Sequence, residues 1–487
     1  MRTPLRVVFY AVNGTGVGHL VRLLAIARWM RRYGAVLGTP LEAWFLTSSE
    51  ADAIVFAEGF AAFKIPSKTI VAEAGLDRRA YLALAKQWVW HTLGLLRPDI
   101  LVVDTFPRGS FGELLSALDL CKHRVFIHRP VKKDVAELPD FRAMLPLYDA
   151  IVVPEHDAEL FLPDAVLGRV AHVGPVLSRE RCEMLSRDEA RLRLGIADEQ
   201  RCVYVSAGGG GDQGAESHLH DVVSALRVDP SLSIVVGAGP LYRGRPVVGA
   251  TTLSGNAADY MNAFDVAVCA SGYNTFGELM FAGVPSVFLP QEKRADDQVA
   301  RAQRACDAGA ACILEDGDVL AAAHRLLAQP NARDAARRVV PDNCARNAAA
   351  EILRLAHNEA EIDALEGAFN DARLCGAQAL GESVVLELAG RLRRGRANED
   401  AVAFDGATKL LTGQLDAAHE IRGIVDAATR LVESGAVTTR VEVALACVEA
   451  LGAFVGGEGA AARALVAEGN VIAADALASA IRKRVPV

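Results

Sequence analysis

Short apolar runs alternate with helical stretches along this chain, and this alternation constrains the fold more than any other feature. Val7–Val12 and residues 99–106, "DILVVDTF", are almost wholly apolar. Between them, Gly18–Arg32 repeats Leu20 and Leu24 at helical spacing. Residues 109–118, "GSFGELLSAL", are also predicted to form a helix. Strands that are apolar along their whole length are typical of parallel sheets covered by helices on both faces. The sequence therefore predicts an α/β fold with doubly wound parallel sheets.

The alternation occurs twice and then stops. It runs through residues 1–170 and restarts after the Gly174-Pro175 linker. Residues 359–487 lack strand-like runs and carry Ala, Leu, Glu and Arg at helical spacing. We therefore predict two Rossmann-like domains, 1–170 and 171–358, followed by an all-helical domain over 359–487. Ligands of doubly wound domains bind at the carboxyl ends of the strands, so we expect the site there, facing a cleft.

Composition excludes several classes of protein. The formal net charge is −8, and no run rich in Lys and Arg with interleaved aromatic residues occurs, so nucleic acid is not an expected partner. The nine cysteines are scattered without a C-x-x-C pair, which favours buried free thiols in a reducing compartment. The N-terminus reads as a strand and no run of about 18 apolar residues occurs. We expect a cytoplasmic protein without a transmembrane segment.

A polar turn interrupts two buried runs at residues 270–285, "ASGYNTFGELMFAGVP". After a strand, Ser271 and Gly272 form a tight turn that opens a helix near Thr275. Backbone N–H groups at a helix start are unpaired and the helix dipole is positive there, so this arrangement attracts a phosphate. Asn274 and Thr275 supply further side-chain donors.

A structural interpretation of the same helix start stays open. Thr275-x-x-Glu278 has the spacing of a capping box, in which each side chain satisfies an unpaired backbone donor. Capping and ligand binding are compatible, so both remain predictions for this pair.

The next strand ends at Leu289-Pro290 and leads into a polar loop. Asp297 and Gln298 in this loop offer acceptors and donors that suit vicinal hydroxyl groups, such as those of a sugar. Such a loop alone is usually a solvated surface segment. Its position directly after the phosphate-type turn favours a binding role.

These residues carry a resemblance to a known family. Residues 259–302 resemble the donor half of GT-B glycosyltransferases, most closely the MurG-like and UDP-glycosyltransferase groups, and the resemblance spans about residues 200–345 and, more weakly, 1–170. It implies that the glycine-rich turn holds the donor diphosphate. One departure is Ala270, where plant-type members have a phosphate-contacting His. Residue by residue, the resemblance assigns the phosphates to Ser271, Gly272, Asn274 and Thr275, the ribose to Glu278, and the sugar to Asp297 and Gln298.

Two other glycine-rich turns follow strands. Gly208, Gly209 and Gly210 belong to "SAGGGGDQG", and their lack of a side chain lets a backbone approach a ligand closely. The resemblance implies that this loop faces the donor diphosphate, and a flexible surface loop is the alternative.

The amino-terminal turn, "NGTGVGH", lacks both the dinucleotide spacing G-x-G-x-x-G and the Lys of a P-loop. It resembles the acceptor-facing turn of the MurG-like group, which assigns Gly14, Thr15, Gly16 and Gly18 to the acceptor side.

His19 closes that turn and begins the first helix. Because the first and fourth strands of a doubly wound sheet are neighbours, the strand that ends at Asp104 brings this carboxylate near His19. In relatives a His-Asp pair at these places deprotonates the acceptor, so the resemblance implies that His19 is the general base and Asp104 its partner. A structural ion pair of Asp104 at the helix start is the alternative. Another strand ends at His128-Arg129, which is expected on the acceptor side.

Together these features predict an inverting glycosyltransferase that uses a nucleotide-sugar donor, most simply a UDP-sugar. The acceptor is a hydroxyl or amine on a small molecule or a lipid-linked compound. No cofactor and no metal are expected, because the one D-x-D, Asp316-Gly317-Asp318, precedes a helix and fits a cap. A nucleotide-sugar hydrolase or 2-epimerase, and a non-catalytic sugar-nucleotide-binding scaffold, remain alternatives. We expect the helical domain over 359–487 either to form a homodimer or to recognise the acceptor.

Overall fold

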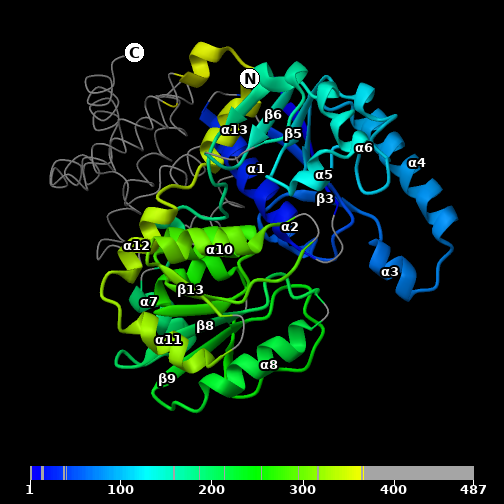
Figure 1. Ribbon diagram of the computed structural model, residues 1–487. Coiled ribbons are helices and arrows are strands. Elements are labelled where there is room, and N and C mark those ends of the chain that lie inside the picture. The colour runs from blue at the N-terminus through cyan, green and yellow to red at the C-terminus, as the bar shows by residue number, and fades with distance from the viewer. Residues whose placement is uncertain are drawn as a thin grey trace, which may run out of the picture.

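A computed structural model describes most of the first 366 residues of the chain. The described residues are 3–363 and 366, except for 13–15, 37–38, 40, 157–159, 186, 213, 254, 294–295 and 315–316. They form two parallel sheets, each covered by helices, and Figure 1 shows the first domain above the second. The predicted helical domain over 359–487, and a homodimer through it, lie almost wholly outside the described residues.

The first sheet has seven strands in the order β3-β2-β1-β4-β5-β6-β7, and all of its pairs are parallel. The order reverses direction beside β1, so β1 and β4 are neighbours, as predicted. This point is the topological switch at which such sheets bind ligands. The strands are β1 (Leu5–Ala11), β2 (Leu41–Thr47), β3 (Ala61–Lys64), β4 (Ile100–Asp104), β5 (His123–Ile127), β6 (Ala150–Val153) and β7 (Val170–His172).

The second sheet repeats the plan with six parallel strands in the order β10-β9-β8-β11-β12-β13. Its switch lies between β8 and β11, whose carboxyl ends carry the "SAGGGGDQG" and "ASGYNT" turns. The strands are β8 (Arg201–Ser206), β9 (Leu232–Gly237), β10 (Thr251–Thr252), β11 (Val266–Cys269), β12 (Ser286–Phe288) and β13 (Ala311–Ile313).

Helices cover both faces of the two sheets (Figure 1). In the first domain they are α1 (Gly18–Val36), α2 (Ala53–Ala57), α3 (Lys68–Glu73), α4 (Arg78–Leu96), α5 (Lys133–Ala136) and α6 (Pro139–Arg142). In the second half they are α7 (Arg187–Leu194), α8 (Ala215–Leu226), α9 (Tyr273–Ala282), α10 (Gln298–Asp307), α11 (Val319–Leu327), α12 (Ala332–Val339) and α13 (Ala345–Leu353). Short 3-10 helices are η1 (Leu118–Leu120), η2 (Leu145–Leu147), η3 (Asp164–Arg169), η4 (Arg181–Glu183) and η5 (Ala257–Ala263).

One predicted helix, over residues 109–118, is wrong. The segment forms turns that end in η1, because Gly109 and Gly112 adopt left-handed backbone angles, φ +79° and +86°, that interrupt a right-handed helix. Glu113 folds back into the turn, and its two carboxylate oxygens accept hydrogen bonds from the N–H groups of Ser110 (2.7 Å) and Phe111 (2.8 Å). The Tyr10 hydroxyl of β1 also donates to Glu113, at 2.5 Å. A buried carboxylate therefore holds this loop against the first sheet.

The two domains have separate cores, and the chain passes between them later than predicted. Val173 and Val176 still belong to the core of the first domain, whereas Leu177 belongs to that of the second. The last described helix then returns. Buried alanines of α13, with Ile352 and Leu353, pack into the same core as α1 and β1. The first domain is therefore completed by residues that follow the second.

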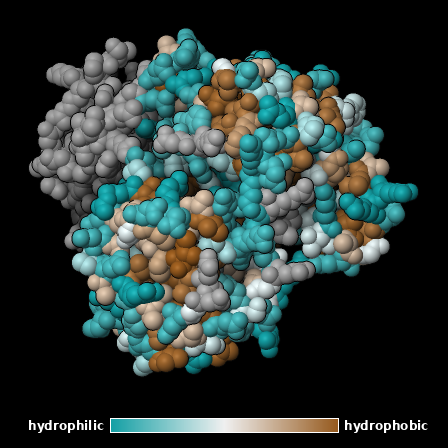
Figure 2. Space-filling model, in the orientation of Figure 1, coloured by the Kyte–Doolittle hydropathy of each residue, from teal (hydrophilic) through white to brown (hydrophobic). Residues whose placement is uncertain are grey.

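The surface mixes hydrophilic and hydrophobic patches on the face that Figure 2 shows, with hydrophilic residues prominent where the two domains meet. Among the described residues, no helix combines the length and the apolar character that crossing a bilayer requires.

We predict that Glu113→Ala destabilises the protein by about 3 kcal/mol or more, because it leaves buried N–H and hydroxyl donors unpaired, at about 1–3 kcal/mol each. Glu137→Ala is the matched control, since Glu137 is exposed and its ion pair with Lys133 spans 3.9 Å. Urea unfolding of the two variants measures the difference. Equal loss of stability in both would contradict the role of Glu113.

Candidate active site

The predicted pair of His19 and Asp104 is formed. His19 is the second residue of α1, Asp104 is the last residue of β4, and their Nδ1 and Oδ1 atoms lie 2.9 Å apart. The Asp104 carboxylate is fully buried, whereas 12% of the His19 side chain remains exposed. The imidazole lies beside the Phe106 ring, with centroids 5.5 Å apart. At the switch point of the first sheet, the partly exposed His19 imidazole therefore contacts the buried carboxylate of Asp104.

Asp104 also forms the structural ion pair that was the alternative. Arg22, one turn after His19 on α1, donates from Nε to Oδ2 at 2.8 Å and from Nη2 to Oδ1 at 3.1 Å. The Thr105 hydroxyl donates to the same carboxylate. Thr105 has φ +62°, a left-handed angle that is strained for a β-branched residue. Such strain persists only where surrounding contacts impose it, and it is concentrated at functional sites.

The charges of the pair follow from its surroundings. Burial lowers the pKa of His19, and the hydrogen bond and charge of Asp104 only partly offset it. Burial by itself would raise the pKa of Asp104, but Arg22 and His19 outweigh it and hold that pKa well below its usual range. Near neutral pH the pair is therefore a neutral imidazole and a carboxylate. Because a carboxylate only accepts hydrogen bonds, Nδ1 carries the proton and Nε2 has the basic lone pair.

At the start of α9 the predicted capping box is absent. The N-cap is Gly272, which offers no side chain, and Thr275 lies inside the helix. Ser271 is fully buried, and its hydroxyl donates to the Gln298 carbonyl at 2.7 Å. The helix start therefore presents backbone N–H groups without a side-chain cap, which is the arrangement that favours an anion.

Two helix N-termini face each other across the domain boundary. Asn274 of α9 donates from Nδ2 to the Gly18 carbonyl at the start of α1, at 3.2 Å. The Asn274 Oδ1 atom is buried and has no hydrogen-bond partner among the described residues. The starts of α1 and α9 thus meet beside His19, where the predicted acceptor and phosphate turns converge.

Glu278 lies one turn further along α9 and takes part in no capping. Its Oε1 atom accepts a hydrogen bond from the Ser178 hydroxyl at 2.6 Å. Burial raises the pKa of Glu278, while hydrogen bonds from Ser178 and the charge of Arg179 act in the opposite direction. A carboxyl group whose pKa is shifted by burial, next to other candidate site residues, is a candidate binding group.

In the loop predicted to bind the sugar, Asp297 is exposed and Gln298 is buried. Asp297 is exposed and caps α10, where it accepts from the Ala300 N–H at 3.0 Å. Gln298 is 5% exposed, and its Oε1 accepts from the Gln291 N–H at 3.0 Å, which closes the loop on itself. A capping carboxylate keeps further acceptor sites, so Asp297 remains compatible with a ligand.

The other glycine-rich loop contacts the amino-terminal turn. A Cβ on Gly209 would lie 3.3 Å from the Gly16 Cα atom, which shows how closely the two loops approach. Gly210 has φ +77°, and a Cβ there would lie 2.2 Å from the Ala238 carbonyl oxygen. Gly208 donates its N–H to the Ser206 hydroxyl at 3.0 Å. The structure brings the loops of both domains together, as the prediction of an interdomain cleft requires.

Three cations lie in the same region, and of these the sequence analysis assigned only Arg129. Arg129 follows β5 and pairs with Asp296 of the second domain at 2.7 Å, and Arg301 of α10 pairs with the same oxygen at 2.8 Å. Arg22 and Arg301 both lie over the Tyr273 ring, 4.9 and 5.6 Å from its centroid. Arg129 was expected on the acceptor side because it ends an apolar strand, whereas nothing in the sequence marked Arg22 or Arg301.

Other predicted acceptor-side residues are less accessible. His128 is 1% exposed and packs near the Phe126 and Phe141 rings, and burial lowers its pKa to about 4. Gly14 and Thr15 lie outside the described residues. Gly18 begins α1 beside Asn274.

In the D-x-D, Asp318 is the N-cap of α11 and accepts from the Ala321 N–H at 3.1 Å, whereas Asp316 lies outside the described residues. No three His, Cys, Asp or Glu side chains gather as metal ligands in the part of the chain that the structure describes.

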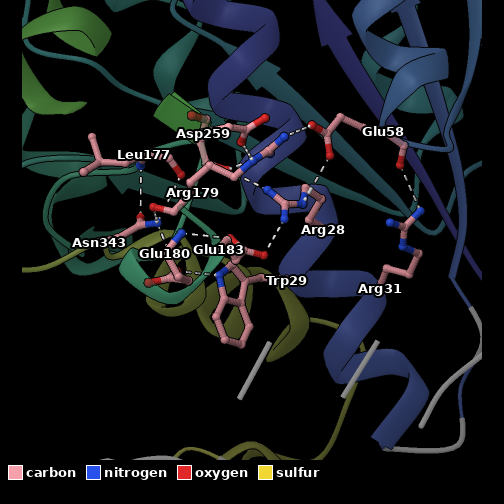
Figure 3. Close-up of polar contacts among 11 residues, drawn as sticks. Arg28, Trp29, Arg31, Glu58, Leu177, Arg179, Glu180, Glu183, Asp259 and Asn343 are labelled. Atoms are coloured by element: carbon pink, nitrogen blue, oxygen red, sulfur yellow. Dashed lines mark hydrogen bonds and ion pairs between the residues drawn. The ribbon is translucent and has the colours of Figure 1, made fainter. Parts of the chain in front are cut away.

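A partly buried charged network joins the two domains (Figure 3). Arg28 of α1 donates to the Glu183 carboxylate at 2.5 Å and to the Ser178 carbonyl at 2.6 Å. Arg179 pairs with Glu58 of the first domain at 2.7 Å and with Asp259 of the second at 2.6 Å. Ser178 also bonds Glu278, so the network reaches the predicted ribose site.

Comparisons with known proteins place this site in a family context. Residues 237–352 match the model of the glycosyltransferase family 28 C-terminal domain. The UDP-N-acetylglucosamine–N-acetylmuramyl-(pentapeptide) pyrophosphoryl-undecaprenol N-acetylglucosamine transferase of Mycobacterium sp. (strain JLS) is 33% identical over 171 residues, which are 32% of this chain and 44% of that protein. The enzyme of the same name from Xanthomonas oryzae pv. oryzae (strain MAFF 311018) is 34% identical over 160 residues, 30% and 36% of the two chains.

Solved structures resemble the chain over a greater length. MurG of Acinetobacter baumannii is 18% identical, with a TM-score of 0.46 over 72% of this chain and 100% of that chain. A calicheamicin glycosyltransferase is 19% identical, with a TM-score of 0.48 over 73% and 100%.

The two doubly wound sheets have the arrangement that the sequence analysis predicted for a GT-B fold. Within the second domain, residues 237–352 match the glycosyltransferase family 28 C-terminal domain model, and the predicted resemblance to the MurG-like group is confirmed. The matches span less than half the length of these curated relatives.

The lowered pKa of His19 predicts a pH-dependent contribution to stability. The unfolded chain binds a proton at His19 below about pH 6.5, whereas the folded chain does so only at lower pH, so folding loses stability as pH falls below that value. His19→Gln should remove this loss, which has a slope of at most about 1.4 kcal/mol per pH unit.

Urea unfolding at about pH 7.5 and about pH 5.5 measures this effect. The exposed His91→Gln serves as the control and should retain the parent's pH dependence. If His19→Gln also retains it, His19 does not titrate as its burial predicts.

Proposed function

We propose that this protein is an inverting glycosyltransferase that moves a sugar from a nucleotide-sugar, most simply a UDP-sugar, to a hydroxyl or amine acceptor. The observation that carries the proposal is the His19–Asp104 pair, 2.9 Å apart, at the edge of the first sheet and beside the uncapped start of α9. Two proteins that are 33% and 34% identical to part of this chain are named UDP-N-acetylglucosamine–N-acetylmuramyl-(pentapeptide) pyrophosphoryl-undecaprenol N-acetylglucosamine transferase.

In the proposed step, the acceptor oxygen or nitrogen attacks the anomeric carbon of the sugar. Its proton passes to Nε2 of His19, and the bond from the anomeric carbon to the diphosphate oxygen breaks. Asp104 keeps the proton on Nδ1 and stabilises the imidazolium that forms, a role that carboxylates have in other His-Asp pairs. A single displacement from the face opposite the leaving group inverts the anomeric carbon.

The leaving diphosphate carries the charge that develops. Backbone N–H groups at the start of α9 and in the loop of Gly208, Gly209 and Gly210 supply neutral donors. Arg129 and Arg301 add positive charge, because both now share the single carboxylate of Asp296 and can exchange it for phosphate oxygens. The mechanism proposed here uses no metal ion and no cofactor.

The remaining donor contacts are proposed for the second domain. Glu278 binds the ribose hydroxyls after releasing Ser178, and Asp297 with Gln298 binds the sugar. The acceptor occupies the first-domain side, at the turn that includes Gly16 and Gly18. An acceptor with a lipid-linked diphosphate is named for the relatives, and we propose that class or a small molecule here. The hydrolase, epimerase and scaffold alternatives gain no support from the relatives.

We predict that His19→Ala lowers kcat by about 10²–10⁴, the range typical of a lost general base. UDP affinity should stay unchanged, because UDP binds the second domain. Asp104→Asn should lower kcat nearly as much, through the wrong tautomer and the loss of the Arg22 ion pair. Radiolabelled sugar transfer and UDP titration calorimetry measure the two quantities.

The double variant distinguishes a unit from two independent groups. If His19 and Asp104 act together, the double variant is little slower than His19→Ala. Losses that multiply would show independent roles, and the exposed His91→Ala should behave as the parent does.

We predict that Glu278→Gln weakens UDP binding by at least about tenfold, because a charge-assisted hydrogen bond contributes roughly 1.5–3 kcal/mol. Its melting temperature should stay near that of the parent, since Glu278 caps no helix and Gln still accepts from Ser178. Ser178→Ala is the control, which keeps the carboxylate and removes only its present partner. Unchanged UDP affinity in Glu278→Gln would exclude Glu278 as the ribose ligand.

A further inference from the structure

A second polar pocket lies where the strands of the second sheet begin. Arg201 is the first residue of β8, and Asp265 comes immediately before β11. Since β8 and β11 are parallel neighbours, both residues mark the amino edge of the sheet. The candidate active site follows the carboxyl ends of the same strands, about 20 Å away along the six residues of β8. The two sites are therefore separate.

This arginine pocket has a volume of about 460 Å³ and is dominated by cations. Pockets that hold small molecules measure roughly 300–1,000 Å³, so the space suits a ligand larger than a single inorganic ion. Helices α7 and α12 lie on the same side of the second domain (Figure 1) and contribute part of the lining. The lining residues are Arg187, Arg201, Asn262, Asp265, Arg333 and Arg337.

The one carboxylate in the lining is already bound. Asp265 accepts from the Cys202 N–H at 2.8 Å and from Arg187 Nη2 at 2.8 Å. Arg191, which is 2% exposed, lies behind it with Nη1 3.6 Å from Oδ2. Arg191 is also held by the carbonyl of Gln200 at 2.8 Å. Two guanidinium groups therefore already match the single negative charge of Asp265.

The other three arginines lack a close carboxylate partner. Arg201 and Arg333 approach Asp265 only to 3.9 and 3.8 Å, and Arg337 approaches the exposed Asp334 at 3.8 Å. Their side chains are 63%, 34% and 49% exposed, respectively. Burial and the neighbouring guanidinium groups lower the pKa of Arg333, which indicates mutual repulsion in the pocket. The arginines around the pocket therefore outnumber the two carboxylates that lie within 4.0 Å of them, Asp265 and Asp334.

We propose that the arginine pocket binds the phosphate groups of a ligand that carries more than one negative charge. Guanidinium groups match phosphate oxygens with paired, charge-assisted hydrogen bonds, and a dianion relieves the repulsion between several of them at once. Two sources supply this chemistry: a soluble phosphate ester or diphosphate, and the phosphate of a lipid headgroup. The site does not rest on the proposed transferase activity, and it differs in place from the donor diphosphate site.

Calorimetric titration of the full chain with inorganic pyrophosphate tests the site. The double variant Arg201→Gln with Arg337→Gln removes two exposed cations without breaking a close contact. The control, Arg325→Gln with Arg338→Gln, changes the charge equally at exposed positions outside the pocket. We expect pyrophosphate affinity to fall at least about tenfold in the pocket variant and to stay unchanged in the control.

Flotation with vesicles of phosphatidylcholine and phosphatidic acid, whose phosphomonoester headgroup carries more than one negative charge, distinguishes the two sources. Pyrophosphate binding that depends on Arg201 and Arg337 supports a soluble ligand. Vesicle binding with the same dependence, and no pyrophosphate binding, supports a lipid headgroup. If neither probe separates the pocket variant from the control variant, or neither probe binds the parent, the proposal is wrong. UDP titration of both variants tests the donor site independently.

Discussion

The buried carboxylate of Asp104 is the point on which the candidate site depends. A charge without solvent costs several kcal/mol unless it is paired, and Asp104 is paired with Arg22, His19 and the Thr105 hydroxyl. Arg22 and His19 lie one turn apart at the start of α1, so their shared partner fixes the helix against β4. The same carboxylate that stabilises the fold therefore also sets the tautomer of the base.

Much of the fold was predictable because its strands are apolar along their whole length. That pattern identified two doubly wound sheets. Because the first and fourth strands of such a sheet are neighbours, the sequence alone also predicted that Asp104 lies beside His19. The helix over 109–118 was mispredicted because Gly109 and Gly112 adopt left-handed backbone angles, and because Glu113 folds back to accept a hydrogen bond from the Tyr10 hydroxyl of β1. Local periodicity contains no information about such a distant contact.

Residues of the candidate site could be predicted only where they belong to one short sequence motif. The turn at Gly272 was visible, yet its capping box was not formed, because the helix begins two residues before Thr275. Arg129 and Arg301 lie in different domains, and both contact Asp296. This contact could not be predicted because Arg129 is far from the other two residues in the sequence. The arginine pocket was hidden for the same reason, since its cations come from the starts or middles of unrelated elements.

The return of α13 to the first domain affects how the chain is made. The core that contains β1 and α1 also contains Ala348 and Leu353, which leave the ribosome only after the whole second sheet. During synthesis, the apolar surface that α13 later covers stays exposed while the second domain forms. The residues of the second domain's core are therefore all synthesised before α13. The core of the first domain is completed only when α13 has been synthesised. Chaperone binding to this uncovered surface would be confined to that interval.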